Sequence, residues 1–108
     1  MTIETIADPN SVSTMAEVRA NIDALDRSIV RLLRQRLDFI EAAARIKQSR
    51  DAVRDEARKA DVINKARLEA ERIGLPTDLV EQLYEQLIEY SIAHEFVRFD
   101  EIRNGESR

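Results

Sequence analysis

The sequence lacks cysteine and has only one histidine among its 108 residues. Without cysteine the chain can form no disulfide bond, no thiolate metal site and no thiol nucleophile, and it suits a reducing compartment. A single histidine also leaves the common imidazole-based zinc sites and catalytic triads hard to build. We therefore expect no metal site, and any chemistry has to come from other residue types.

Glycine and proline are scarce too, with two of each, and aromatic residues make up 5%. These low counts, together with 44% hydrophobic and 35% charged residues, are typical of an all-helical protein with an aliphatic core. A chain of this length is expected to form a single domain.

Long apolar runs are also missing. None approaches the ~20 residues needed to span a bilayer, and the first residues lack the basic and apolar segments of a secretory signal. The net charge of -4 argues against general nucleic-acid binding, since contacts to phosphates favour a basic face. We expect a soluble cytoplasmic protein whose partners include neither nucleic acid nor membrane.

What is present is a strong helical periodicity. Apolar residues recur every three or four positions between Val18 and Lys47, and Thr14 (or Ser13) with Glu17 forms a capping-box pattern. This predicts one long helix from about residue 14 to about residue 50. The polar stretch 48–54 is predicted to be a connecting loop.

Two further helices are predicted after this loop. The second begins near Asp55 as its N-cap and ends at Gly74, since Pro76 forbids continuation. The third, of about 25 residues, is capped by Thr77 or Asp78. The expected inner faces carry Val62, Ile63, Ala66, Ala70 and Ile73 in the second helix and Leu79, Leu83, Leu87, Ile88, Ile92, Phe96 and Phe99 in the third.

The predicted organisation is a flexible tail at 1–13, a helical domain at 14–103 and a frayed end at 104–108. A first helix of this length cannot bury its apolar stripe against the rest of so short a chain. It needs a partner chain. We therefore expect an all-α fold, a three-helix chain (long, medium, long) that pairs with a second copy into a helical bundle.

Two cations interrupt the apolar stripe of the first helix. Arg36 and Lys47 lie within roughly 20° of each other around the helix and about 16 Å apart along it. Buried cations need anionic partners, so the two side chains could grip a small anionic molecule. Alternatively, each reaches solvent or pairs with a carboxylate on another helix. Arg19 lies about 100° away and could reach such a cluster only from another chain.

Several other polar residues can be explained by a purely structural role as well as by a functional one. Arg58 begins the second helix and lies on the surface or points inward, while Lys59 is read as part of a solvated face. In the third helix Ser91 and Glu95 fall on the apolar stripe, and an inward Glu95 is either paired with an arginine or protonated. His94 is expected to lie on the outside or at a dimer contact.

Six of these polar residues, in their order and spacing along the chain, closely resemble the pattern of the all-helical chorismate mutase family. The resemblance covers about residues 15 to 100. The residues that carry the resemblance are Arg19, Arg36, Lys47, Arg58, Ser91 and Glu95. The resemblance implies an intertwined homodimer with two sites for a small dicarboxylate, each completed by one residue of the other chain, Arg19. It implies that Arg19, Arg36 and Arg58 bind the carboxylates, and that Lys47 and Glu95 face the ether oxygen of the breaking bond.

The same resemblance places Ser91 and Asp55 in the substrate site, although Asp55 is most simply a helix cap. It implies a cofactor-free pericyclic rearrangement of chorismate to prephenate, in which Arg36, Lys47 and Glu95 are the catalytic candidates. Such a reaction gains from restricting a flexible substrate and from placing cations where negative charge develops. This would serve aromatic amino acid biosynthesis.

Two residues depart from the family pattern. Glu95 stands where many bacterial members have Gln, and an ionised carboxylate would repel the ether oxygen, so we expect activity to require a protonated Glu95. Lys59 stands where some mutases carry a Glu that contacts the substrate hydroxyl.

Three alternatives remain open from the sequence. The first is isochorismate pyruvate lyase, a salicylate-forming branch of the same family, and the second is a mutase that acts on an amino analogue of chorismate. The third is a dimerising helical module without catalysis.

Overall fold

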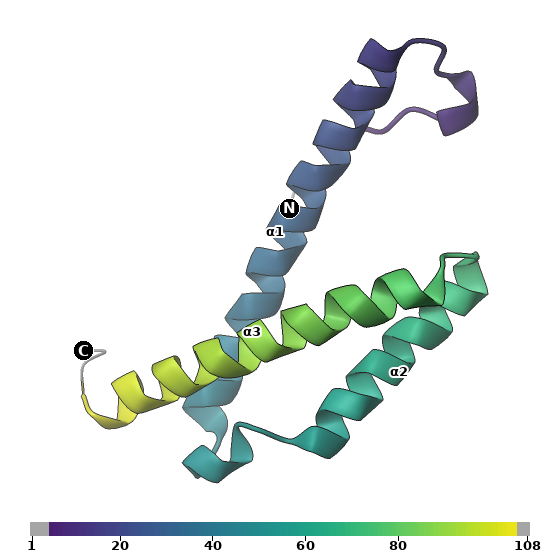
Figure 1. The fold of residues 1–108 in the computed structure, drawn as a ribbon. Helices are drawn as coiled ribbons and strands as arrows, with labels where there is room; N and C mark the ends of the chain where they lie inside the picture. Colours follow the sequence, from purple (N-terminus) through teal and green to yellow (C-terminus); the bar gives the residue numbers. More distant parts are fainter. Residues whose placement is uncertain (1–4, 106–108) are drawn as a thin grey trace. The chain divides into compact units, whose positions relative to one another are not determined.

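The computed structural model describes residues 5–105, and within this range the chain is all helical and has no strand. Its three helices are α1 (Met15–Ile46), α2 (Glu56–Ile73) and α3 (Thr77–Arg103), shown in Figure 1. Two short 3-10 helices, η1 (Pro9–Ser11) and η2 (Arg50–Ala52), precede and follow α1. The predicted all-α chain with a long, a medium and a long helix is therefore confirmed.

The chain divides into two compact units, Met1–Asp38 and Phe39–Arg108. In the first unit, α1 begins as the capping pattern predicted. The hydroxyl of Thr14 accepts a hydrogen bond from the backbone N–H of Glu17 at 3.1 Å and donates one to the Glu17 carboxylate at 3.0 Å. This satisfies one of the backbone donors that the first turn of a helix leaves unpaired.

Part of the segment predicted as a flexible tail has structure of its own. The Asp8 side chain caps η1 by accepting from the backbone N–H of Asn10, and the N–H of Ala7 donates to the Asn21 side chain of α1 at 2.9 Å. These bonds hold the segment before α1 against the first turns of that helix. Residues 1–4 of the predicted flexible tail and 106–108 of the predicted frayed end lie outside the described range.

The second unit contains the hydrophobic core. Its buried residues are Ala44, Val53, Ile88, Ile92 and Phe99, against which Val62, Ile63, Tyr84 and Phe96 pack. The core therefore joins the last turns of α1, the connecting segment, α2 and α3. Burial of these apolar side chains is the main stabilising contribution in this unit.

The first helix ends earlier than predicted, at Ile46 instead of about Arg50. The last helical hydrogen bond runs from the N–H of Lys47 to the carbonyl of Ala43 at 2.9 Å. Beyond it the backbone turns so that Val53, at 3% exposure, can enter the core. A helix continued to Arg50 would carry Val53 away from this position, so tertiary packing decides where α1 ends.

The second helix begins and ends where the sequence predicts. Asp55 caps α2 by accepting from the N–H of Arg58 at 3.0 Å. Gly74 ends the helix with a φ of 76°, a left-handed conformation that only glycine adopts without strain. The prediction for α3 was wrong in detail, because Pro76 occupies the N-cap position and no side chain caps the helix.

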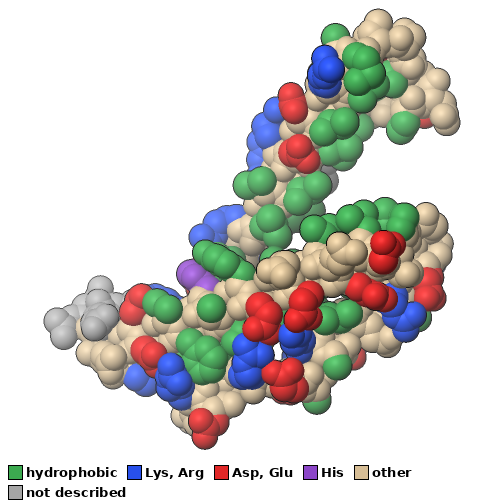
Figure 2. Space-filling model, viewed as in Figure 1, with side chains coloured by type: hydrophobic (Ala, Val, Ile, Leu, Met, Phe, Trp, Pro, Cys, Tyr) green, Lys and Arg blue, Asp and Glu red, His purple; other side chains and the backbone are tan. Residues whose placement is uncertain are grey.

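Several residues predicted to face inward are exposed in the chain. Ile73, Leu79 and Leu83 are 59%, 45% and 59% exposed, and the predicted α1 stripe is also largely uncovered. The exposed large apolar residues of α1 include Ile22, Leu25, Ile29 and Leu33. Figure 2 shows hydrophobic side chains at the surface along α1 and α3. Nevertheless, none of the helices in the described range is both long enough and apolar enough to cross a membrane.

Candidate active site

Lys47 and Glu95 form the ion pair around which the candidate site is built. The Lys47 Nζ lies 2.7 Å from Glu95 Oε2, which joins the segment after α1 to the buried face of α3. The Glu95 side chain is 5% exposed and that of Lys47 is 29% exposed. Lys47 and Glu95 are 48 positions apart in the sequence, and the fold brings their side chains into contact.

The geometry of this pair leaves hydrogen-bonding capacity unused. Glu95 Oε2 is buried, and the Lys47 ammonium 2.7 Å away approaches it from a poor direction for a hydrogen bond. A buried carboxylate oxygen with only a poorly aligned donor is not fully satisfied. The pair is therefore a place where a further donor or a polar ligand atom would be accommodated favourably.

Ser91 lies one turn before Glu95 on the same face of α3, and each residue as a whole is 4% exposed. The Ser91 hydroxyl donates to the carbonyl of Leu87 at 2.7 Å. The predicted inward position of both polar residues is confirmed, because they interrupt a row of buried apolar residues. The hydroxyl can exchange its local backbone bond for one to a ligand.

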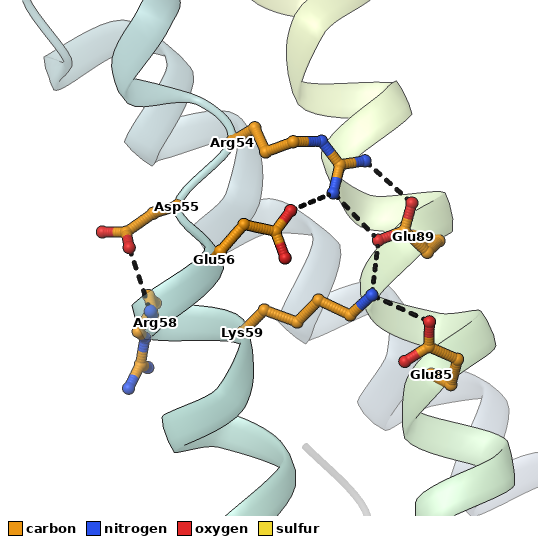
Figure 3. Close-up of polar contacts among 7 residues, drawn as sticks. All are labelled: Arg54, Asp55, Glu56, Arg58, Lys59, Glu85 and Glu89. Carbon is orange, nitrogen blue, oxygen red and sulfur yellow. Dashed lines mark hydrogen bonds and ion pairs between the residues drawn. The ribbon is translucent and has the colours of Figure 1, made fainter.

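Arg58, the predicted carboxylate-binding residue of α2, is turned away from α3 (Figure 3). Its side chain is 63% exposed and pairs with Asp61 at 2.7 Å on its own helix. Asp55 acts as the cap of α2. The sequence allowed either a surface position or an inward position for Arg58. In this chain Arg58 lies on the surface.

The interpretation of Lys59 as part of a solvated face was wrong. Its side chain is 16% exposed, and Nζ donates to Glu85 at 2.8 Å and to Glu89 at 2.9 Å across the α2–α3 contact. Arg54 donates to Glu89 as well, at 2.8 and 3.1 Å, and also bonds Glu56 (Figure 3). The spacing of Glu85 and Glu89, four residues apart on one helix face, is the sequence signal that could have indicated an acidic partner for Lys59.

These contacts make Glu89 a strongly paired carboxylate. Hydrogen bonds from Arg54 and then from Lys59 lower the pKa of Glu89 from 4.5 to about 2. The hydrogen bonds that Arg54 donates to Glu89 and Glu56 raise the pKa of Arg54, and those that Lys59 donates to Glu85 and Glu89 raise the pKa of Lys59. Both cations are thus already compensated by carboxylates of this chain, which makes them poor candidates for binding a substrate anion.

His94 contacts α1, which sequence reasoning missed. Its Nε2 lies 2.7 Å from Glu41 Oε2, and its ring stacks on Tyr90 with the centroids 6.4 Å apart. This contact joins α3 to the last turns of α1, two turns before Lys47. It therefore adds a second polar link beside the Lys47–Glu95 pair.

Arg19 and Arg36 belong to the first unit, and Lys47, Ser91 and Glu95 belong to the second. Arg19 is exposed near the start of α1, and Arg36 is partly buried. In the described range, no group of three or more His, Asp or Glu side chains is placed to hold a metal ion. What the second unit offers is the Lys47 ammonium paired with the buried carboxyl group of Glu95, and the buried hydroxyl of Ser91 one turn away on α3.

Most of the chain is similar to a known protein family. Residues 18–96 match the family described as chorismate mutase type II. The chain is 33% identical over 97 residues to isochorismate pyruvate lyase of Pseudomonas aeruginosa. The aligned region covers 90% of this chain and 96% of that protein.

A second relative is T-protein of Haemophilus influenzae, 27% identical over 85 residues. This similarity covers 78% of the present chain but only 22% of T-protein, so the chain corresponds to a small part of that protein. Because the family match extends over well over half of its residues, the chain belongs to the chorismate mutase type II family.

Proposed function

We propose that the chain is a chorismate mutase that rearranges chorismate to prephenate without a cofactor. The observation that carries this proposal is the Lys47–Glu95 pair, in which an ammonium and a buried carboxyl group share one place beside Ser91. An ether oxygen bound there would accept a hydrogen bond from Lys47, whose charge stabilises negative charge as the carbon–oxygen bond breaks. For Glu95 to donate to the same oxygen it has to carry a proton, because an ionised carboxylate would repel that charge.

The carboxylates of the substrate are assigned to arginines. A guanidinium presents two parallel donors that match a carboxylate, which favours Arg over Lys for this task. We assign Arg36, Arg58 and Arg19 to this role, with Asp55 holding the first turn of α2 on which Arg58 lies. Arg58 would have to exchange Asp61 for the substrate, and since its present ion pair is exposed this exchange costs little.

The proposed enzyme is a homodimer in which Arg19 reaches the site of the other chain. The exposed apolar residues of α1 support this proposal, since a single chain leaves Ile22, Leu25, Ile29 and Leu33 between 41% and 52% exposed. Uncovered apolar rows of this kind mark a protein–protein interface. A second copy would bury the stripe against an equivalent stripe.

Isochorismate pyruvate lyase is the second candidate. It is supported by the relative from Pseudomonas aeruginosa, which matches this chain almost from end to end. The same cationic site would bind isochorismate and release pyruvate to leave salicylate. Ser91, which lines the site in the resemblance to the mutases, favours the mutase modestly. Lys59, which stands where some mutases carry a Glu, favours the lyase slightly.

Product analysis separates the two candidates. The purified protein is incubated separately with chorismate and with isochorismate, and prephenate and salicylate are identified by chromatography and mass spectrometry. The proposal predicts prephenate from chorismate at a rate far above the uncatalysed one. If the protein forms salicylate from isochorismate but no prephenate from chorismate, the mutase proposal is wrong and the lyase is the function.

A helical module without catalysis also fits the Lys47–Glu95 pair, but it predicts a different result with ligands. Thermal unfolding is followed with prephenate or a bicyclic transition-state mimic. A ligand that binds only the folded protein, present at about 100 times its Kd, stabilises by roughly 2.7 kcal/mol. An unchanged unfolding temperature, together with no turnover of either substrate, would favour the non-catalytic module.

A further inference from the structure

Arg103, in the last turn of α3, holds the backbone that carries Lys47. Its Nη1 donates to the carbonyl of Ala44 at 2.6 Å, and its Nη2 donates to the carbonyl of Lys47. The guanidinium also lies over the ring of Phe99, 3.7 Å from its centroid. One side chain therefore connects the end of α1 to the buried face of α3.

The carbonyls at the end of α1 need such a partner. The last turn of a helix leaves several carbonyl groups without an intrahelical donor, and it carries a partial negative charge. A guanidinium provides several donors in a fixed plane, so it can bond two carbonyls at once. Ala44 is fully buried and Phe99 is 6% exposed, so the clamp is built on the packed part of the unit.

The position of Arg103 links it to the proposed catalytic pair. Lys47 is held at its carbonyl by Arg103 and contacts Glu95 through its ammonium. Glu95 and Arg103 project from the same helix, two turns apart. The distance between the ammonium and the carboxyl group therefore depends on how firmly the backbone at Lys47 is fixed to α3.

We propose that Arg103 is a positioning residue that sets the place of the Lys47 ammonium through the carbonyls of Ala44 and Lys47. This inference rests on the proposed function, because the ammonium matters for catalysis only if Lys47 faces the reacting atoms. Arg103 lies beyond the residues that match the family, 18–96. Its role follows from the contacts of this chain alone.

Arg50 provides the matched control. It also links the segment after α1 to α3, bonding Asp100 at 2.9 and 3.3 Å and lying 4.5 Å from the centre of the Phe96 ring. Neither contact reaches the carbonyls that Arg103 bonds. Arg50→Gln therefore removes a comparable arginine from the same region without releasing Lys47.

The test compares Arg103→Gln, Arg103→Lys and Arg50→Gln in the full chain. We expect Arg103→Gln to lower kcat by about tenfold or more, since small displacements of a catalytic group are costly, while KM changes by less than about threefold. Arg103→Lys can still donate to one carbonyl and should recover part of kcat. Arg50→Gln should leave kcat within about twofold of the unmodified chain.

Amide hydrogen exchange gives a readout that does not depend on turnover. The Lys47 N–H, bonded to Ala43, should exchange at least about tenfold faster in Arg103→Gln and be unchanged in Arg50→Gln. Unchanged exchange would overturn the clamp even if the chain turned over neither substrate. If the chain is active, equal kcat values for Arg103→Gln and Arg50→Gln would overturn the positioning role and leave the proposed function standing.

Discussion

At the scale of single residues, the contact between Lys47 and Glu95 relates sequence to chemistry most directly. The sequence indicated that both polar groups interrupt apolar stripes, and the structure places them 2.7 Å apart. Helical periodicity could predict the inward direction of each side chain. It could not predict their pairing, because that depends on the place where α1 ends and the chain turns back.

Glu95→Gln tests the protonation state on which the proposed mechanism depends. A glutamine amide can donate to the ether oxygen at any pH, whereas the carboxyl group has to be protonated to do so. We therefore expect kcat/KM of the unmodified chain to fall as pH rises, and kcat/KM of the variant to remain level over the same range. Measuring kcat/KM with chorismate from about pH 5 to pH 9 checks this. Identical pH profiles would exclude the donor role of Glu95.

Gly74 shows a backbone effect confined to one residue. A Cβ at this position would meet no atom within 4 Å, so the cost of a larger residue comes from its φ of 76° alone. We expect Gly74→Ala to lower the free energy of unfolding by about 1 kcal/mol. Gly74→Asn should cost less, because asparagine tolerates this conformation better. Urea unfolding measures both, and equal stability of all three chains would contradict the argument.

At the scale of elements, α2 and α3 are joined by charge as well as by their apolar faces. Glu89 accepts from Arg54 and Lys59, and these bonds lower its pKa from 4.5 to about 2. Its stabilising effect is therefore complete above the pKa of the unfolded chain. The effect is lost as pH falls through the interval from about 4.5 to about 2.

Glu89→Gln tests this contribution. The variant should unfold at a lower temperature than the unmodified chain at pH 7, and the difference should shrink as pH falls toward 2 and as salt is added. Glu81→Gln is the control, since Glu81 pairs with Arg67 Nε across the same two helices at the longer distance of 3.9 Å. A difference that stays constant with pH would show that the Glu89 carboxylate charge is not the cause.

The elements also show how far local sequence signals extend. The Thr14 and Asp55 caps and the end of α2 at Gly74 could be predicted, because each depends on a few neighbouring residues. The end of α1 could not, because burial of Val53 and the contacts of Arg103 decide it. The bonds of Lys59 escaped prediction for a similar reason, since its partners lie on another helix.

At the scale of the whole molecule, the proposed active site needs two chains. The proposal takes Lys47, Ser91 and Glu95 from one chain and Arg19 from the other. The exposed apolar residues of α1 support the same proposal, because a second copy would cover them. The complete set of carboxylate-binding and ether-binding residues is therefore expected only in the dimer.

Mixing two inactive variants tests this arrangement most directly. Arg19→Ala and Lys47→Met chains are each measured alone and then unfolded and refolded together in equal amounts, with chorismate as substrate. In a mixed dimer one site carries both substitutions and the other carries neither. Random pairing should therefore restore about a quarter of the activity of the unmodified chain. A mixture no more active than the separate variants would contradict a site shared between two chains.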